Sequence, residues 1–295
     1  FVDGDPAGDA KAEAQLRAIV REAGFAAISF QFEPIAAALA YEQQVTREEV
    51  ALIADIGGGT SDFSIVRIGP ERRRRADRAA DILANDGIRV GGTDFDRALS
   101  LGTVMPLLGF RGPMRRAGLP VPSGYYFDLA TWSTINRLYE PGILQELNEV
   151  RREAARPDEI GRLIHVLEER GGHRLAIEIE AAKIALSDSA EVPLPLAWVE
   201  GGLARTIRRD ELVGHTRDLA GRIAARIGHC LRDAGLGPDG IGAVFLTGGS
   251  TRLAHVRAAI LAMAPEARVV DGDTFGSVGT GLTIEAARRY GPLAA

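Results

Sequence analysis

Apolar residues follow two spacings along the chain. A spacing of three or four predicts helices over residues 10–22, 35–42, 93–99, 177–186, 211–234, 253–263 and 278–290. Short runs of continuous or alternating apolar residues predict strands over residues 26–32, 50–54, 63–68, 192–199 and 243–246. Since the two patterns are interspersed, the chain is expected to form an α/β fold.

From residue 103 to residue 172 the pattern becomes irregular. Prolines interrupt it, an aromatic cluster occupies residues 125–132, and helical spacing resumes after Tyr139. This segment is interpreted as part of a subdomain that is inserted into the α/β core.

A glycine-rich turn joins two of the predicted strands. It contains Asp55, three consecutive glycines (Gly57, Gly58, Gly59), Thr60 and Asp62. Because a strand follows the glycines and no lysine does, the turn is neither a Walker A loop nor a dinucleotide-binding fingerprint. Glycines let backbone N–H groups approach a phosphate closely, and Thr60 adds a hydroxyl. Asp55 would be in position to hold magnesium through water.

A second glycine turn ends the strand predicted at 243–246. Gly248 and Gly249 place bare backbone at the strand end, and Ser250 is expected to cap the following helix. Arg252 could stack on a flat ring such as adenine.

Composition narrows the function classes. The 295 residues carry a net charge of -5, which argues against a nucleic-acid footprint, and the basic run at 72–75 is expected to be a solvated loop. A single cysteine, Cys230, excludes an internal disulfide, and five histidines without ligand spacing disfavour a zinc enzyme. With no long apolar run or signal peptide, we expect a cytoplasmic protein that does not bind membranes.

Four motifs together resemble the ATPase domain of DnaK-type 70-kDa heat-shock chaperones, within the actin, hexokinase and chaperone ATPase superfamily. They are the glycine hairpin at 55–62, a Glu-Pro corner at 33–41, Gly-Gly-Thr-Asp-Phe-Asp at 91–96 and Leu-Thr-Gly-Gly-Ser-Thr-Arg at 246–252. The resemblance covers nearly the whole chain outside residues 103–172. Residues 31–34 and 125–132 are most similar to the YegD branch, chaperone-like proteins that lack the usual substrate-binding domain.

The resemblance implies an actin-like ATPase (ribonuclease H-like) lobe that binds ATP or ADP with magnesium. Asp55 and Asp62 are implied to face the metal, Gly57–Gly59 and Thr60 the β- and γ-phosphates, and Glu33 the reactive water. The remaining nucleotide-binding positions that it implies are Gly91, Gly92, Glu180, Lys183, Ser187, Gly248, Gly249, Ser250, Arg252 and Asp273.

The implied domain organisation has three parts. Residues 1–47 would be a remnant of lobe I, residues 48–92 and 212–295 the nucleotide-binding core of lobe II, and residues 93–211 an inserted α+β subdomain. Because the family's first phosphate hairpin and its nearby lysine are not found, we expect an N-terminal truncation with most of the first lobe missing. Half a phosphate clamp is expected to hydrolyse ATP weakly or not at all.

The predicted function is therefore that of an ATP-binding, slowly ATP-hydrolysing domain of a chaperone-like protein without a substrate-binding domain. Its partners would be adenine nucleotide and, unidentified, unfolded-protein clients or co-chaperones. Two alternatives stay open at this point: a bacterial actin-like filament protein and a small-molecule kinase of the same superfamily.

Overall fold

The chain forms two compact units in the computed structural model, which describes residues 6–31, 33–73, 75, 78–116, 118–272 and 276–291. The sheet unit comprises Phe1–Gly92 and Ala220–Ala295, and the helical unit comprises Thr93–Leu219. None of the helices in these described ranges combines the length and the apolar character that crossing a membrane requires.

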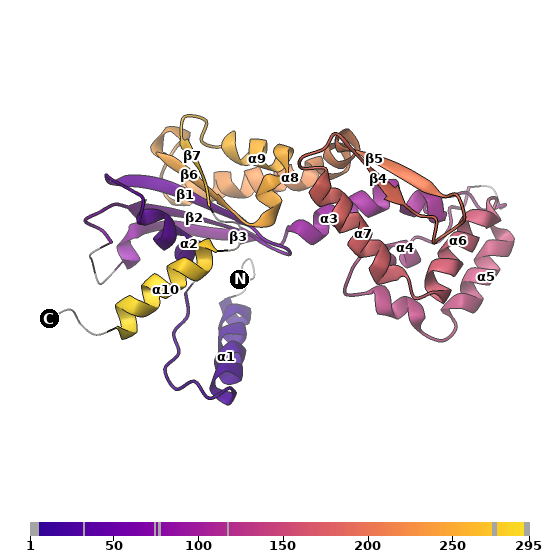
Figure 1. The fold of residues 1–295 in the computed structure, drawn as a ribbon, viewed down its shortest axis with the longest axis horizontal. Coiled ribbons are helices and arrows are strands. Elements are labelled where there is room, and N and C mark those ends of the chain that lie inside the picture. The colour runs from indigo at the N-terminus through magenta and orange to yellow at the C-terminus, as the bar shows by residue number, and fades with distance from the viewer. Residues whose placement is uncertain are drawn as a thin grey trace. The chain divides into compact units, whose positions relative to one another are not determined.

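A five-stranded mixed sheet lies at the centre of the sheet unit (Figure 1). Its order is β3 (Ile82–Ile88), β2 (Ser61–Ile68), β1 (Glu49–Ile56), β6 (Ala243–Thr247) and β7 (Arg268–Asp271). β2 pairs antiparallel with both β1 and β3, whereas β6 pairs parallel with β1 and β7. The central strand β1 thus has an antiparallel neighbour on one side and a parallel neighbour on the other.

Helices cover both faces of this sheet (Figure 1). One face carries α2 (Glu33–Glu42) and α10 (Ser277–Tyr290), and the other carries α9 (Ala254–Leu261) and the C-terminal half of α8 (Arg209–Asp233). A further helix, α1 (Pro6–Glu22), precedes α2.

The core under α2 is built from small and branched residues of the sheet and one aromatic pair. Ala51 and Ile53 of β1 are fully buried and belong to the same cluster as Tyr41 and Phe245. The two rings stack with centroids 5.2 Å apart. The Tyr41 hydroxyl donates a hydrogen bond to Glu49 Oε1 at 2.7 Å, so this buried aromatic residue keeps its polar end paired.

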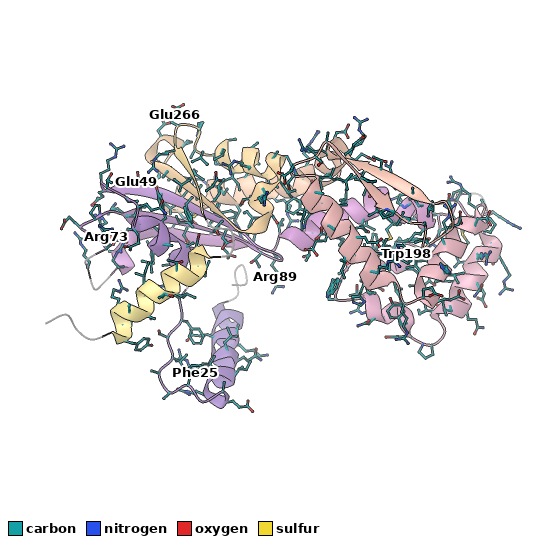
Figure 2. The ribbon with its side chains drawn as sticks, in the orientation of Figure 1. Phe25, Glu49, Arg73, Arg89, Trp198 and Glu266 are labelled. Carbon is teal, nitrogen blue, oxygen red and sulfur yellow. The ribbon has the colours of Figure 1, made fainter. Side chains whose placement is uncertain are left out.

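Besides the first part of α8, the helical unit contains five helices and a hairpin within its described residues. They are α3 (Gly92–Thr103), α4 (Gly124–Leu129), α5 (Ile143–Glu153), α6 (Pro157–Glu168), α7 (Gly172–Ala185) and the antiparallel pair β4 (Glu191–Pro195) and β5 (Ala204–Arg208). Trp198, labelled in Figure 2, donates its indole N–H to Glu178 of α7 at 3.0 Å, and the Arg174 guanidinium lies 4.5 Å from the ring centroid. These contacts attach the segment after β4 to α7.

Single turns of 3₁₀ helix complete the described elements. They are η1 (Ala79–Asp81), η2 (Met105–Leu108), η3 (Ile135–Tyr139), η4 (Pro238–Gly240) and η5 (Gly249–Arg252).

Every helix predicted from the spacing is confirmed, and one predicted strand is wrong. Residues 26–31 form no strand, because none of the described strands lies beside them to share backbone hydrogen bonds, and Phe32 lies outside the described residues. The strand predicted over 192–199 is shorter and ends at Pro195. β3, β5 and β7 were not predicted.

In the basic run at 72–75, Arg73 and Arg75 are exposed as predicted for a solvated loop, but Arg72 is not. The Arg72 side chain is mostly buried and bonds to Glu48 at 2.8 Å and to Asp81. Arg78 joins Asp81 to Glu42, which is almost fully buried at the end of α2. Arg72 therefore belongs to an ion-pair network, which a run of arginines in the sequence did not reveal.

The helices α2 and α10 make one unusually close contact. A Cβ atom built on Gly281 would lie 1.7 Å from the Ala36 carbonyl oxygen, so only glycine fits there. Gly279, one half-turn earlier on α10, has nothing within 4 Å of the corresponding position. The close packing of α10 on α2 therefore depends on Gly281.

We expect Gly281→Ala to lower the free energy of unfolding by about 1–3 kcal/mol, because backbone must move to admit the methyl group. The matched control, Gly279→Ala, should be neutral or stabilise by roughly 0.5–1 kcal/mol through helix propensity. Urea unfolding followed by circular dichroism measures both. Equal effects of the two substitutions would contradict the close contact.

Candidate functional site

Three strands bring candidate residues together at the end of β1. Asp55 lies directly opposite Asp62 in the antiparallel β1–β2 register. On its other side Asp55 is the parallel register partner of Thr247, the last residue of β6. Asp55 is buried, with 7% of its surface exposed. Two predicted metal-facing carboxylates therefore share one corner of the sheet.

The placement of two carboxylates opposite each other is electrostatically unfavourable. Like charges at directly opposite sheet positions repel. Burial raises the pKa of Asp62, and the hydrogen bond that Thr60 Oγ1 donates to Asp62 Oδ2 at 3.0 Å acts in the other direction. A divalent cation beside Asp55 and Asp62 would relieve the repulsion, so the donor set fits a magnesium ion held directly or through water.

The three glycines of the hairpin border open space. A Cβ on Gly58 or Gly59 would meet nothing within 4 Å, and one on Gly57 would make an ordinary 3.5 Å contact with the Thr60 carbonyl oxygen. None of the three has a left-handed φ angle. Neither packing nor backbone conformation therefore requires these glycines, and the open space at their side-chain positions is a candidate cradle for a bound group.

Two other glycines are required by the close approach of the chain. A Cβ on Gly248, which has a φ of 81°, would lie 2.4 Å from the Ile56 carbonyl oxygen and 2.5 Å from Asp55 Oδ1. A Cβ on Gly91 would lie 2.5 Å from the Gly59 nitrogen. Both of these glycines therefore pack directly against the β1–β2 hairpin.

Gly92 completes this packing, because its N–H donates to the Gly57 carbonyl at 2.9 Å. The structure thus brings three separately predicted motifs together at the hairpin: residues 55–62, the paired glycines at 91–92 and the turn at 248.

The turn after β6 differs from the prediction in one respect. Ser250 does not cap α9, whose N-cap is Leu253 without a side-chain hydrogen bond. The turn of 3₁₀ helix η5 separates Ser250 from α9, and Thr251 Oγ1 stabilises it by donating to the Gly248 carbonyl at 2.7 Å. Ser250 is buried in this turn, whereas Arg252 is exposed.

Thr247 was missed by the sequence analysis. Its hydroxyl oxygen is buried and is one of the side-chain atoms without a hydrogen-bond partner in the described part of the chain. Since buried hydroxyls are nearly always paired, an unpaired one beside Asp55 indicates a site that a ligand can complete. The signal was present as a polar residue at the end of a wholly apolar strand.

The helix predicted to carry Glu180, Lys183 and Ser187 is α7, in the helical unit. Glu180 is exposed, Lys183 is buried, and Ser187 follows the end of the helix. Lys183 Nζ donates to Asp96 Oδ2 at 3.0 Å and also lies 2.9 Å from Oδ1.

Burial raises the pKa of Asp96 to about 6, although the ammonium of Lys183 opposes this shift. Like Thr247, Asp96 was not singled out by the sequence analysis. A buried lysine needs an acidic partner, and this requirement could have pointed to an aspartate such as Asp96.

Two predicted site residues fall wholly or partly outside the described residues. Glu33 begins α2, but its side chain lies outside the described residues, as does Asp273 altogether.

Comparison with known proteins gives the family. A family model described as "Hsp70 protein" matches residues 9–102 and 164–287. The chain belongs to the Hsp70 family. Its mixed sheet with flanking helices is the actin-like ATPase fold of that family. The match leaves out residues 103–163, most of the segment predicted to be irregular.

Individual relatives are chaperones. The chain is 31% identical over 278 residues to a protein named chaperone protein HscA homolog from Azotobacter vinelandii. The matched residues make up 93% of this chain and 34% of that protein. The chain is also 28% identical over 240 residues to a chaperone protein DnaK from Trichormus variabilis. That match covers 80% of this chain and 27% of the relative. The Hsp70-family chain described here thus spans about a third of the length of these relatives.

We expect Lys183→Met to destabilise the helical unit more at pH 8 than at pH 5. A raised carboxyl pKa means that the folded state binds its proton more tightly than the unfolded state, so Asp96 is mostly neutral at pH 5. At pH 8 the buried carboxylate would lose its cation, and the extra loss should be about 1–3 kcal/mol.

Urea unfolding followed by tryptophan fluorescence measures this effect, because Trp132 and Trp198 both lie in the helical unit. Lys11→Met, which replaces the other lysine of the chain on α1, is the control and should show no such pH dependence. The same destabilisation of Lys183→Met at both pH values would be evidence against the pair.

Proposed function

We propose that the chain is the nucleotide-binding domain of a chaperone-like ATPase, with the phosphates of ATP in the cradle at Gly57–Gly59. The observation that carries the proposal is that these glycines leave open space beside two opposed carboxylates, Asp55 and Asp62. A chain that needed glycine only for its own turn would show a left-handed φ or a close contact there, as Gly248 does.

Each hairpin residue has a role in this proposal. The backbone N–H groups of Gly58 and Gly59 would bind phosphate oxygens, because the Gly57 N–H already donates to the Thr60 carbonyl at 2.9 Å. The exposed Thr60 hydroxyl, which donates to Asp62, would turn to reach the same group. Asp55 and Asp62 would hold magnesium, which neutralises phosphate charge when bound. Asp55 would also orient the attacking water, with Glu33 nearby as the resemblance implies.

The nucleoside end of the ligand would lie at the turn that follows β6. The proposal assigns contacts with adenosine to Gly248, Gly249, Ser250 and Arg252, at the turn that packs on Asp55. Gly91, Gly92, Glu180, Lys183, Ser187 and Asp273 stay predictions from the family resemblance.

The names of the relatives support a wider chaperone function for this proposal. DnaK and HscA homologues are named chaperone proteins, which supports slow ATP hydrolysis coupled to unfolded-protein clients or co-chaperones. We propose residues 48–92 and 212–295 as the nucleotide-binding core and 93–211 as its inserted subdomain. Similarity to the YegD branch, with its lack of a substrate-binding domain, stays a prediction, as does the cytoplasmic location.

Magnesium dependence tests the proposal. Calorimetric titration with ATP should show at least about tenfold tighter binding with magnesium than with a chelator, equivalent to roughly 1.4 kcal/mol. Asp55→Asn should lose this dependence and serve as the blank for phosphate release, in which the chain is expected to be slow. If magnesium did not change the affinity of the chain for ATP, the result would contradict the assignment of Asp55.

Gly58→Val should abolish the preference for ATP over adenosine while leaving the fold intact. The valine side chain would occupy the cradle, yet it meets no protein atom within 4 Å of its Cβ and needs no unusual φ. Affinities for ATP and adenosine, measured by calorimetry, should then agree within about threefold.

The matched control is Gly237→Val. Gly237 also lies in the sheet unit with extended backbone and open surroundings, but away from the hairpin. It should keep the full preference for ATP. If the Gly58 variant kept that preference as well, the hairpin would not be the phosphate site.

A further inference from the structure

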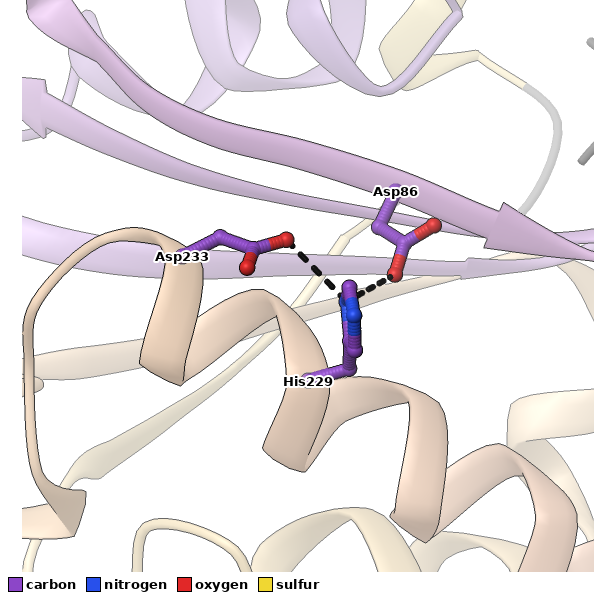
Figure 3. A group of neighbouring side chains, drawn as sticks. All are labelled: Asp86, His229 and Asp233. Carbon is purple, nitrogen blue, oxygen red and sulfur yellow. Dashed lines mark hydrogen bonds and ion pairs between the residues drawn. The ribbon is translucent and has the colours of Figure 1, made fainter. Parts of the chain in front are cut away.

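One histidine lies between two carboxylates on the surface of the sheet unit (Figure 3). His229 Nδ1 is 3.1 Å from Asp86 Oδ2 and 3.0 Å from Asp233 Oδ2. His229 and Asp233 are one turn apart on α8, whereas Asp86 comes from the edge strand β3, so the trio joins two elements far apart in the sequence.

The distances of the two carboxylate oxygens from Nδ1 match those between ligands of one metal ion. All three lie within 4.8 Å of one another. Zinc binds histidine nitrogen and carboxylate oxygen at about 2.0–2.2 Å. With angles between right-angled and tetrahedral, neighbouring ligand atoms are then roughly 2.8–3.6 Å apart by the same bond lengths. The two distances from Nδ1 fall within that range.

The surrounding contacts hold Asp86 in the required orientation. Its other oxygen, Oδ1, accepts a hydrogen bond from the Gly87 N–H at 2.8 Å, which leaves Oδ2 facing His229. Asp86 is largely buried, while the side chains of His229 and Asp233 are 48% and 53% exposed. The trio therefore has a fixed inner ligand and an outer side from which an ion can enter.

The charges at this point are better balanced by a cation than by the imidazole alone. Nδ1 carries at most one proton, and one N–H makes only one well-aligned hydrogen bond, yet two carboxylate oxygens approach it equally closely. Arg226 Nε lies 3.4 Å from Asp86 Oδ2, but it donates to the Gly87 carbonyl at 3.0 Å. Within the described part of the chain, the ion-pair contact of the Asp233 carboxylate is with His229.

We propose that Asp86, His229 and Asp233 bind one divalent transition-metal ion of the zinc class. Imidazole nitrogen with two carboxylate oxygens suits zinc better than magnesium, which prefers oxygen ligands alone, and a solvent molecule would fill the remaining position. The ion would fasten the edge strand β3 to the end of α8. The adjacent Cys230 is not a ligand, because its buried thiol faces the Phe63 carbonyl at 3.9 Å.

Titration of the 295-residue chain with Zn²⁺, in competition with a chromogenic chelator, tests the site. We expect one saturable equivalent, and at least tenfold weaker binding in His229→Gln and in Asp233→Asn. His173→Gln and Asp239→Asn remove a histidine and a carboxylate elsewhere and should bind as the unmodified chain does. Asp233 is exposed on α8, so its variant keeps the test valid should His229→Gln fold poorly.

Two further measurements separate a metal site from an imidazolium shared by two carboxylates. Zn²⁺ should increase hydrogen-exchange protection of residues 82–88 at least threefold, and His229→Gln should abolish the increase. Arg226→Gln, which removes a competing cation, should tighten Zn²⁺ binding several-fold. No saturable binding, unchanged affinity in His229→Gln, or weaker binding in Arg226→Gln would overturn the proposal.

Discussion

The double pairing of β1 is the constraint on which the site depends. Its buried residues, among them Leu52 and Ile53, hold it between antiparallel β2 and parallel β6. Because both neighbours are in register with Asp55, the hairpin that follows β1 and the turn that follows β6 meet at one corner. The candidate site is therefore formed by residues at the ends of several strands rather than by a single loop.

Glycines at this corner do two different jobs. Gly91 and Gly248 let one stretch of backbone lie against another, and a methyl group at either position would collide with the hairpin. A methyl group added to Gly57, Gly58 or Gly59 would collide with no neighbouring atom. Gly91 and Gly248 are therefore needed for packing, whereas Gly57–Gly59 leave space in which a ligand could bind. Comparing what a Cβ atom would meet at each glycine separates these two roles.

Local patterns in the sequence were enough to predict the hairpin and the helices outside residues 103–172, whereas they could not predict contacts between distant residues. The β1–β2 turn follows from apolar runs around Gly57–Gly59. β3 escaped prediction because an edge strand can carry polar residues such as Asp86. Lys183 with Asp96, and His229 with Asp86, are pairs 87 and 143 residues apart, and no spacing rule reaches across such intervals.

Because the chain contains few lysines, chemical labelling of amines can report on the Lys183–Asp96 pair. Of 35 lysines and arginines, only Lys11 and Lys183 are lysines, and Lys11 is exposed on α1 whereas Lys183 is buried. An acylating reagent that attacks side-chain amines therefore meets one open target and one protected target. The ratio of label at the two positions reports, within a single molecule, how often the interior of the helical unit opens to solvent.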